Sequence, residues 1–222
     1  MAHQALIVFL KYPRPGRVKT RLVPALGAET TAELYRALAE EVLRATISSK
    51  GEYETLVFFD PPEEAEATRA WLTGVRLRAQ SAGDLGERMS AAFAQAFARG
   101  AERVAIIGTD AVGVTGQVVA ESLAALEEAD VVVGPAVDGG YYLVALKEAR
   151  PELFEGISWS TSTVLEETLG RAAALGLGVH QRPALRDLDD LEDLGAEWPR
   201  VRPLLVGHPG LCRRIEGVLG LP

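Results

Sequence analysis

The sequence Ala5-Leu-Ile-Val-Phe-Leu-Lys-Tyr-Pro-Arg-Pro-Gly-Arg-Val-Lys-Thr-Arg21 places a short apolar run directly before a cationic loop. The run at 5–10 is bounded by a segment that contains proline and glycine, which is typical of a buried β-strand and its end. Two prolines and a glycine fix an irregular loop after it. The stretch therefore predicts a strand that leads into a rigid, positively charged loop.

Apolar runs of this kind alternate along the chain with longer segments of helical period. Such alternation is typical of βαβ units around a mostly parallel sheet and predicts an α/β fold. The apolar runs predict strands at 5–10, 54–60, 75–78, 103–108, 130–135, 141–146 and 177–182. The segments between them carry Ala, Leu and Glu at spacings that give one apolar face. They predict helices at 28–48, 62–73, 85–99, 115–128 and 160–175.

Length and composition fit one globular domain. The chain has 222 residues, of which 48% are hydrophobic and 24% charged, so it can bury a sizeable core. No internal repeat or linker divides it, but the alternation is lost after Leu194. We therefore expect a single domain over 1–222, with a C-terminal helical appendage over 195–222.

Three features predict a cytoplasmic protein. The longest apolar runs are far shorter than the roughly 20 residues that cross a bilayer, so we expect no membrane span. The first residues show neither the charged leader nor the cleavage site of an export signal. Cys212 is the only cysteine, which excludes an intrachain disulfide and suits a reducing compartment.

The charge distribution predicts a local anion site. A net charge of −8 argues against general nucleic-acid binding, because an acidic protein repels the phosphate backbone. Residues 1–28 nevertheless contain no Asp or Glu, and five cations fall within one short stretch of them: Lys11, Arg14, Arg17, Lys19 and Arg21.

Ligands of open α/β sheets bind outside the carboxyl ends of the strands, and the segment 11–21 follows the first strand. Its cations and backbone N–H groups suit phosphate oxygens, whereas the alternative is a solvated basic loop. The position after the first strand favours the anion site. The segment is not a Walker P-loop, because Gly16 is followed by Arg-Val-Lys-Thr without the second glycine and the Gly-Lys pair.

Two further strand ends carry carboxylates. Asp110 follows the run at 103–108. One carboxylate there suffices to bind Mg²⁺ or Mn²⁺ if phosphate oxygens and waters complete the metal's coordination shell. The alternative is that Asp110 forms an Asx turn or a helix cap. Asp138-Gly-Gly-Tyr-Tyr142 predicts a hairpin turn with residues at positive φ. Asp138 is in addition a candidate to accept a proton or to bind a hydroxyl group.

Two polar segments favour structural roles. Gln80-Ser-Ala-Gly-Asp-Leu-Gly-Glu-Arg88 reads most simply as a turn and a helix start around Gly83 and Asp84, although Gln80 and the local backbone are also candidates to recognise a base edge. Asp187-Leu-Asp-Asp190 is more typical of an exposed helix N-terminus than of a metal site.

Six segments, in this order, resemble one known family. They are Phe9-Leu-Lys-Tyr-Pro-Arg-Pro-Gly-Arg-Val-Lys-Thr-Arg-Leu22, Gly83-Asp-Leu-Gly-Glu-Arg-Met89, Gly108-Thr-Asp110, Asp138-Gly-Gly-Tyr-Tyr-Leu143, Trp159-Ser-Thr161 and Asp187-Leu-Asp189. From about Leu6 to Leu194 the chain is similar to the GT-A-like family of uncharacterised glycosyltransferases once listed as a domain of unknown function. That family is related to molybdenum-cofactor and phospholactate nucleotidyltransferases.

This resemblance implies a fold and a set of site residues. The fold is a three-layer α/β/α arrangement with a mostly parallel mixed sheet, the Rossmann-like GT-A fold of nucleotide-diphospho-sugar transferases. Asp110 is implied as the metal-binding aspartate and Asp189 as a second ligand, for Mg²⁺ or Mn²⁺. Gly16, Lys19 and Arg21 are implied near the phosphates. Together with the two loops described above, the residues expected around the nucleotide are Lys11, Gly16, Lys19, Thr20, Arg21, Gln80, Gly83 and Asp84. Family members usually follow the metal-binding aspartate with Cys-Pro or a similar X-Pro pair, whereas this chain has Ala111-Val112-Gly113.

The function expected from these residues is metal-dependent transfer from a nucleotide-activated donor. The first expectation is a glycosyltransferase that moves a sugar from a nucleotide-diphospho-sugar to a small acceptor. The metal, Lys19 and Arg21 would neutralise the departing diphosphate, and Asp138 would take the acceptor's proton. The alternatives are a nucleotidyltransferase that releases pyrophosphate from a nucleoside triphosphate, and a nucleotide-binding module without turnover.

Overall fold

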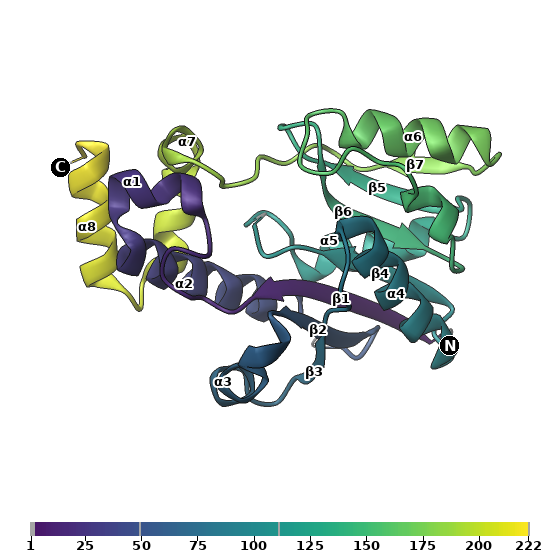
Figure 1. Cartoon of the computed structure of the whole chain (residues 1–222), viewed down its shortest axis with the longest axis horizontal. Coiled ribbons are helices and arrows are strands. Elements are labelled where there is room, and N and C mark those ends of the chain that lie inside the picture. Colours follow the sequence, from purple (N-terminus) through teal and green to yellow (C-terminus); the bar gives the residue numbers. More distant parts are fainter. Residues whose placement is uncertain (1–2, 49, 111, 222) are drawn as a thin grey trace.

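The computed structural model describes residues 3–48, 50–110 and 112–221, which form one seven-stranded sheet with helices on both faces (Figure 1). The strand order is β3-β2-β1-β4-β6-β5-β7, and β6 runs antiparallel to both of its neighbours. The strands are β1 (Gln4–Lys11), β2 (Glu54–Asp60), β3 (Arg76–Ala79), β4 (Arg103–Ile107), β5 (Val131–Pro135), β6 (Tyr141–Leu146) and β7 (Val179–Gln181). The predicted α/β class with a mostly parallel, mixed sheet is confirmed.

The helices follow the strands as the alternation predicts. The α-helices are α1 (Val23–Leu26), α2 (Ala28–Thr46), α3 (Ala65–Trp71), α4 (Leu85–Ala98), α5 (Gly116–Ala125), α6 (Val164–Ala174), α7 (Leu191–Val201) and α8 (Pro209–Leu219). Short 3₁₀ turns lie at Thr20–Leu22, Pro62–Glu64, Pro151–Phe154 and Arg202–Leu205. None of the helices in the described ranges is both long and apolar enough to cross a membrane.

Two hydrophobic cores lie on opposite faces of the sheet, which gives the three layers. The first packs α2 and α5 against one face, and the second packs α4, α6 and the turn at Pro151–Phe154 against the other. The first strand supplies both cores because its side chains alternate: Leu6 and Val8 face α2, whereas Ala5 and Ile7 face α4. A strand that is buried on both faces explains the continuous apolar run in the sequence.

Local capping residues explain where several helices begin. The side chains of Asp84, Thr115 and Asp190 each accept a backbone N–H three residues further along, at the starts of α4, α5 and α7. At α4 the arrangement is a reciprocal capping box, because Glu87 accepts the N–H of Asp84 in return. The helix starts predicted at 115 and near Asp84, and the helix N-terminus predicted at Asp187–Asp190, are confirmed.

A third core joins the two ends of the chain. Leu22, Leu34 and Leu38 from the N-terminal part pack against Leu194 and Leu211 of α7 and α8. Figure 1 shows α1, α7 and α8 together at one end of the molecule, beside the start of α2. The segment predicted to be helical, 195–222, does contain helices, but the first of them begins at Leu191. These helices pack against the segment that follows β1.

Several predicted elements differ in extent, and three of the differences are instructive. The strand expected at 177–182 is reduced to Val179–Gln181, an edge strand that pairs with β5. The helix expected at 62–73 begins as a 3₁₀ turn, and the helix expected at 160–175 begins only at Val164. The delay has a tertiary cause. The loop before α6 lies against the β5–β6 hairpin at Ser162, whose carbonyl oxygen is 2.0 Å from the place of a Cβ on Gly139, and the N–H of Leu165 donates to the carbonyl of Gly139.

Candidate functional site

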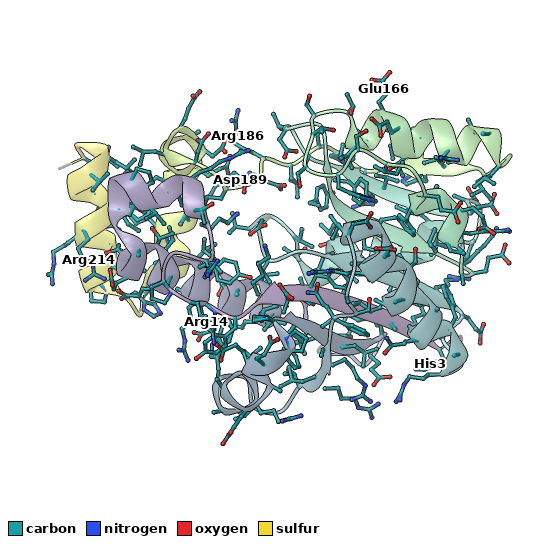
Figure 2. All side chains as sticks on the ribbon, viewed as in Figure 1. His3, Arg14, Glu166, Arg186, Asp189 and Arg214 are labelled. Carbon is teal, nitrogen blue, oxygen red and sulfur yellow. The ribbon has the colours of Figure 1, made fainter. Side chains whose placement is uncertain are left out.

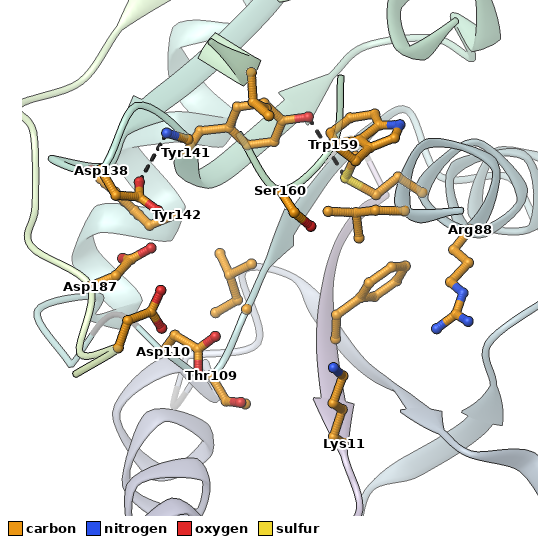
Figure 3. A pocket seen from close by; sticks show the side chains of 18 of the residues that line it. Lys11, Arg88, Thr109, Asp110, Asp138, Tyr141, Tyr142, Trp159, Ser160 and Asp187 are labelled. Carbon is orange, nitrogen blue, oxygen red and sulfur yellow. Dashed lines mark hydrogen bonds between the residues drawn. The ribbon is translucent and has the colours of Figure 1, made fainter. Parts of the chain in front are cut away.

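An open cavity of about 1090 Å³ lies at the carboxyl ends of β1 and β4, where a nucleotide-binding α/β sheet carries its ligand. Its walls also include the first turn of α4, the start of β6, the loop at 159–162 and the segment at 187–189. Figure 3 shows Asp110, Asp138 and Asp187 along one side of it and Lys11 and Arg88 on the other. The cavity therefore has an acidic side and a basic side.

Most residues expected at the site from the sequence line this cavity. They are Lys11, Lys19, Thr20, Arg21, Gln80, Gly83, Asp84, Asp110, Asp138 and Asp189. Gly16 is not among the lining residues; its φ of +73° forms the turn that returns the chain toward the cavity. The cationic loop and Asp110 each follow a strand of the sheet, which predicts that they lie close together. In the structure they line the same cavity.

The cationic loop divides into two parts. Arg14 forms an ion pair with Glu64, and Figure 2 shows it on the side of the molecule that carries α3, apart from Asp189. Lys11, Arg17, Lys19 and Arg21 line the cavity. The returning half is anchored on both sides of Lys19, because Val18 is buried in the first core and Leu22 in the third.

Lys19 lies between the two carboxylates that were expected to bind a metal. Its Nζ is 2.8 Å from Oδ1 of Asp110 and 2.9 Å from Oδ1 of Asp189, and only 5% of its side chain is exposed. Burial by itself would lower the pKa of Lys19, but the two carboxylates outweigh it and raise that pKa. Lys19 is therefore held as a cation by the acidic pair.

The backbone at Lys19 has an unusual conformation. Its φ of 44° lies in the left-handed region, and Ser160, with φ 64°, is the other non-glycine residue at positive φ among those described. Both residues line the cavity, and Figure 3 shows the Ser160 hydroxyl directed into it. Strained residues that gather at one cavity are typical of a functional site.

Asp187 also belongs to the site, although Asp189 alone of its segment was expected there. Its Oδ1 is buried and has no hydrogen-bond partner among the described residues. Burial, followed by the neighbouring charges of Asp110 and Asp138, raises the pKa of Asp187 to about 7, although Lys19 opposes the shift. The alternation of polar and apolar residues in Asp187-Leu-Asp189 could have indicated this role. Leu188 is fully buried, and the aspartates on either side of it both line the cavity.

Asp138 lies in the predicted hairpin turn between β5 and β6. Its Oδ1 accepts the N–H of Gly140 at 2.9 Å, and the side chain faces the cavity (Figure 3). Gly139 at φ +93° leaves no room for a side chain, since a Cβ there would lie 2.0 Å from the carbonyl oxygen of Ser162. The hairpin and the loop that carries Ser160 are thus pressed together, which fixes one wall of the site.

The basic side of the cavity is held by hydrogen bonds around Gln80. The Gln80 amide donates to the carbonyl of Phe58 at 2.9 Å, and Arg88 donates to the carbonyl of Gly83 at 2.9 Å. Arg88 also lies 3.5 Å from a carboxylate oxygen of Asp60. The donor group of Gln80 is therefore engaged with the protein backbone, and Arg88 is the residue on this wall that sequence reasoning missed.

Tyr35 connects the two strand ends that carry the site. Its hydroxyl accepts the N–H of Lys11 at 2.8 Å and shares a 3.0 Å hydrogen bond with the hydroxyl of Thr109, the residue before Asp110. Burial, together with the nearby Asp110 charge, raises the pKa of Tyr35, so its hydroxyl stays neutral. No sequence motif marks Tyr35, because its position on the apolar face of α2 is that of an ordinary core residue.

The acidic pair has the chemistry of a magnesium or manganese site. Asp110 and Asp189 offer hard oxygen atoms, and both reach one cation-sized position, the Nζ of Lys19. Within the described part of the chain, no three His, Cys, Asp or Glu side chains are grouped as a metal cage. Two carboxylates fit a Mg²⁺-type ion whose remaining ligands are waters and substrate phosphates. Ala111, the first residue of the departure from the family pattern, lies outside the described residues.

Solved structures share this fold. The chain is 31% identical to the "putative nucleotide-diphospho-sugar transferase" of Desulfovibrio desulfuricans G20, with a TM-score of 0.87, over 97% of this chain and 99% of that one. The 4-diphosphocytidyl-2C-methyl-D-erythritol synthase of Anaerococcus prevotii DSM 20548 gives a TM-score of 0.58 at 8% identity, over 90% and 99%. Rv0371c of Mycobacterium tuberculosis H37Rv, in complex with manganese, gives 0.50 at 16% identity, over 89% and 97%. A comparison with curated proteins gives no match.

The fold and the site together define a transferase with the nucleotide-diphospho-sugar transferase fold. Residues 42–161, more than half of the chain, match the family described as "Uncharacterized protein conserved in bacteria (DUF2064)". The chain belongs to this family, and the resemblance found in its motifs is confirmed.

Proposed function

We propose that the protein is a metal-dependent glycosyltransferase that moves a sugar from a nucleotide-diphospho-sugar to a small acceptor. One observation carries the proposal. Four cations of the cationic loop (Lys11, Arg17, Lys19 and Arg21) and the pair Asp110 and Asp189 line a single cavity at the carboxyl ends of β1 and β4. A diphosphate with a bound divalent ion needs this combination of cations and hard oxygen ligands.

The donor's diphosphate would bind on the side of the cationic loop. Lys11, Arg17 and Arg21 are exposed at the cavity, and no ion pair joins them to an acidic residue in the described ranges. Their charges and that of Lys19 offset the charge that develops on a departing diphosphate. A divalent ion held by Asp110 and Asp189 would supply further charge neutralisation at the same phosphates.

The acceptor would bind on the acidic side, next to Asp138. In the transfer step, the acceptor hydroxyl oxygen bonds to the anomeric carbon, and the bond from that carbon to the phosphate oxygen breaks. The nucleoside diphosphate leaves with the electron pair, and the Asp138 carboxylate accepts the hydroxyl proton. Tyr141, beside Asp138, and Trp159, toward Arg88, line the same cavity (Figure 3) and offer flat surfaces for a sugar ring.

The name of the Desulfovibrio desulfuricans relative supports a nucleotide-diphospho-sugar donor, and the manganese complex of Rv0371c supports a divalent ion. The single cysteine, Cys212, suits the reducing cytoplasm, where we place the reaction. The acidic net charge of −8 supports a small-molecule acceptor over nucleic acid.

Nucleotidyl transfer is the second candidate. The observation that favours it is the cationic loop directly after β1, which suits a triphosphate as well as a diphosphate. The Anaerococcus prevotii neighbour, a 4-diphosphocytidyl-2C-methyl-D-erythritol synthase by name, also supports it. In this reaction the acceptor attacks the α-phosphate and pyrophosphate leaves. A nucleotide-binding module without turnover is the third candidate.

A ligand screen followed by product analysis separates the three candidates. Melting temperatures would be measured with UDP-, GDP-, CDP- and dTDP-sugars and with the free triphosphates, each with Mg²⁺ and with Mn²⁺, because a ligand of the folded state raises the melting temperature. The stabilising donor would then be incubated with the protein in water and with a set of small hydroxyl and phosphate compounds as acceptors, and the released phosphate compound identified. A nucleoside diphosphate supports glycosyl transfer, pyrophosphate supports nucleotidyl transfer, and the absence of turnover with every stabilising ligand supports the binding module.

A further inference from the structure

We propose that the Lys19 ammonium and a divalent cation exclude one another from the pair Asp110 and Asp189, so that metal binding releases Lys19 to the donor's phosphates. This inference rests on the proposed function, because it takes the acidic pair as the metal site. It adds an order of assembly in which the metal binds before Lys19 can act on the donor.

The first support is the position of the Lys19 ammonium. Its Nζ lies at hydrogen-bond distance from an oxygen of each carboxylate, 2.8 Å from Asp110 and 2.9 Å from Asp189. A Mg²⁺-type ion bound by the same two oxygens would stand roughly 2.0–2.1 Å from each of them. The ammonium and the ion would therefore occupy overlapping space, and both are compact cations.

The second support is that Lys19 is built into this position. Its side chain is 5% exposed, and its backbone adopts the left-handed conformation, which costs a non-glycine residue free energy. Val18 and Leu22, both buried, hold the chain on either side. A lysine that only attracted phosphate from solvent would need neither the burial nor the unusual backbone.

The third support is the contrast with the other cations of the loop. Lys11, Arg17 and Arg21 are exposed and have no ion pair with an acidic side chain in the part of the chain that the structure describes. Among the described residues, Lys19 is the one of these four loop cations that contacts Asp110 and Asp189. The charge of Lys19 is therefore already compensated and becomes available to a phosphate only if another cation takes its place.

The charge of the acidic wall explains why a cation is needed there. Asp110, Asp138, Asp187 and Asp189 line one cavity, and their mutual repulsion must be offset. A single ammonium supplies one positive charge, whereas a divalent ion supplies two. Exchange of the ammonium for the ion thus improves compensation of the acids and adds a free cation beside the donor's phosphates.

The test is Mn²⁺ binding without any nucleotide, measured by isothermal titration calorimetry. Lys19→Met should bind Mn²⁺ at least about tenfold more tightly than the wild type, because an opposite charge at this distance changes a carboxylate's affinity for a proton by roughly ten- to a thousandfold. Lys11→Met is the matched control, since it removes one positive charge from the same cavity without touching the acids. It should change the affinity much less.

Equal Mn²⁺ affinity of Lys19→Met and Lys11→Met, or weaker binding by Lys19→Met, would overturn the inference. Asp110→Asn and Asp189→Asn distinguish that result from failure of the proposed function. If both bind Mn²⁺ as the wild type does, the acidic pair is not the metal site, and the proposed function fails together with the inference. If both lose Mn²⁺ while Lys19→Met gains nothing, the metal site stands and only the exclusion by Lys19 is wrong.

A second measurement uses the wild-type protein and does not depend on the folding of any variant. Lysine acylation by an N-hydroxysuccinimide ester, mapped by mass spectrometry, reports whether each ammonium is accessible. Lys19 should be protected in the presence of a chelator and should become severalfold more reactive with Mn²⁺, whereas exposed Lys11 should react equally in both conditions. Unchanged protection of Lys19 at saturating Mn²⁺ would contradict the exchange.

Discussion

Tyr35 shows how a buried side chain outside every recognised motif can position the site. Its hydroxyl group joins the end of β1 at Lys11 to the end of β4 at Thr109. Thr109 is itself buried, and Asp110 follows it directly. The separation of the cationic loop from the acidic pair is thus set partly by one phenol on α2.

We expect Tyr35→Phe to weaken Mn²⁺ binding as well as the fold. The variant keeps the ring but leaves the Thr109 hydroxyl and the Lys11 N–H without their partner, at a cost of about 1–3 kcal/mol in the free energy of unfolding. Urea unfolding and Mn²⁺ calorimetry would measure the two effects.

Tyr53→Phe is the control for this prediction. Tyr53 is also a buried tyrosine of the first core, and its hydroxyl donates to the carbonyl of Thr46 at 2.6 Å, away from the cavity. It should lose stability but keep its Mn²⁺ affinity. If Tyr35→Phe binds Mn²⁺ as tightly as Tyr53→Phe does, Tyr35 does not position the metal site.

Asp187 predicts a pH-dependent stability of the metal-free protein. The pKa of Asp187 is about 7 in the folded chain and about 3.8 in the unfolded chain, so between these values the folded state holds a proton that the unfolded state has lost. The stability contributed by this proton is therefore present at low pH and is lost as the pH rises through the folded pKa.

Asp187→Asn cannot ionise and should avoid this loss. In the presence of a chelator, its free energy of unfolding relative to that of the wild type should rise between pH 4.5 and pH 8 by an amount on the order of 1 kcal/mol or more. Thermal unfolding across the pH range is the measurement. A difference between the two proteins that stays constant from pH 4.5 to pH 8 would show that Asp187 does not titrate as the structure implies.

At the level of elements, the start of α4 serves both the fold and the cavity. Asp84 caps the helix in a reciprocal box with Glu87 and also lines the cavity. Asp84→Ala should lose about 0.5–2 kcal/mol in the free energy of unfolding, whereas Asp84→Asn should keep most of it because asparagine caps helices equally well. Chemical denaturation compares the two variants, and equal losses would mean that the cap is unimportant here.

The elements could be predicted from the sequence wherever a local pattern determines them. The strand at 5–10 is apolar throughout because both of its faces are buried, and Thr115 marks a helix start by its own side chain. The late start of α6 at Val164 could not be predicted, since it depends on contact with the hairpin at Gly139, which is distant in the sequence.

The site was predictable to the extent that its residues follow strands. Asp110 and Lys19 were found by their position after β4 and β1, but the direct contact between them depends on the left-handed backbone at Lys19, which no propensity predicts. Arg88 and Tyr35 reach the cavity from helices, where their spacing resembles that of ordinary surface and core residues.

At the scale of the whole molecule, the third core makes the C-terminal helices part of the site's support. Leu211 of α8 packs in the cluster that also contains Leu22, three residues after Lys19. We infer that the chain folds as one cooperative unit and that the C-terminal segment stabilises the cationic loop.

Leu211→Ala tests this cooperativity. The variant should lose about 2–5 kcal/mol in the free energy of unfolding and should still unfold in a single transition. Val206→Ala, at an exposed position of the same segment, should change the stability by less than about 0.5 kcal/mol. Separate calorimetric transitions for the C-terminal segment and the sheet would show that the segment is an independent unit.

The most direct test of the central claim is whether nucleotide binding depends on a metal held by Asp110. Calorimetric titration with UDP, GDP, CDP and dTDP, each with and without Mn²⁺, would compare the wild type with Asp110→Ala. We predict that at least one nucleotide binds the wild type at least about tenfold more tightly with Mn²⁺, and that Asp110→Ala abolishes the difference. If every nucleotide that binds does so with the same affinity in both proteins, whether or not Mn²⁺ is present, the shared metal and phosphate site is contradicted.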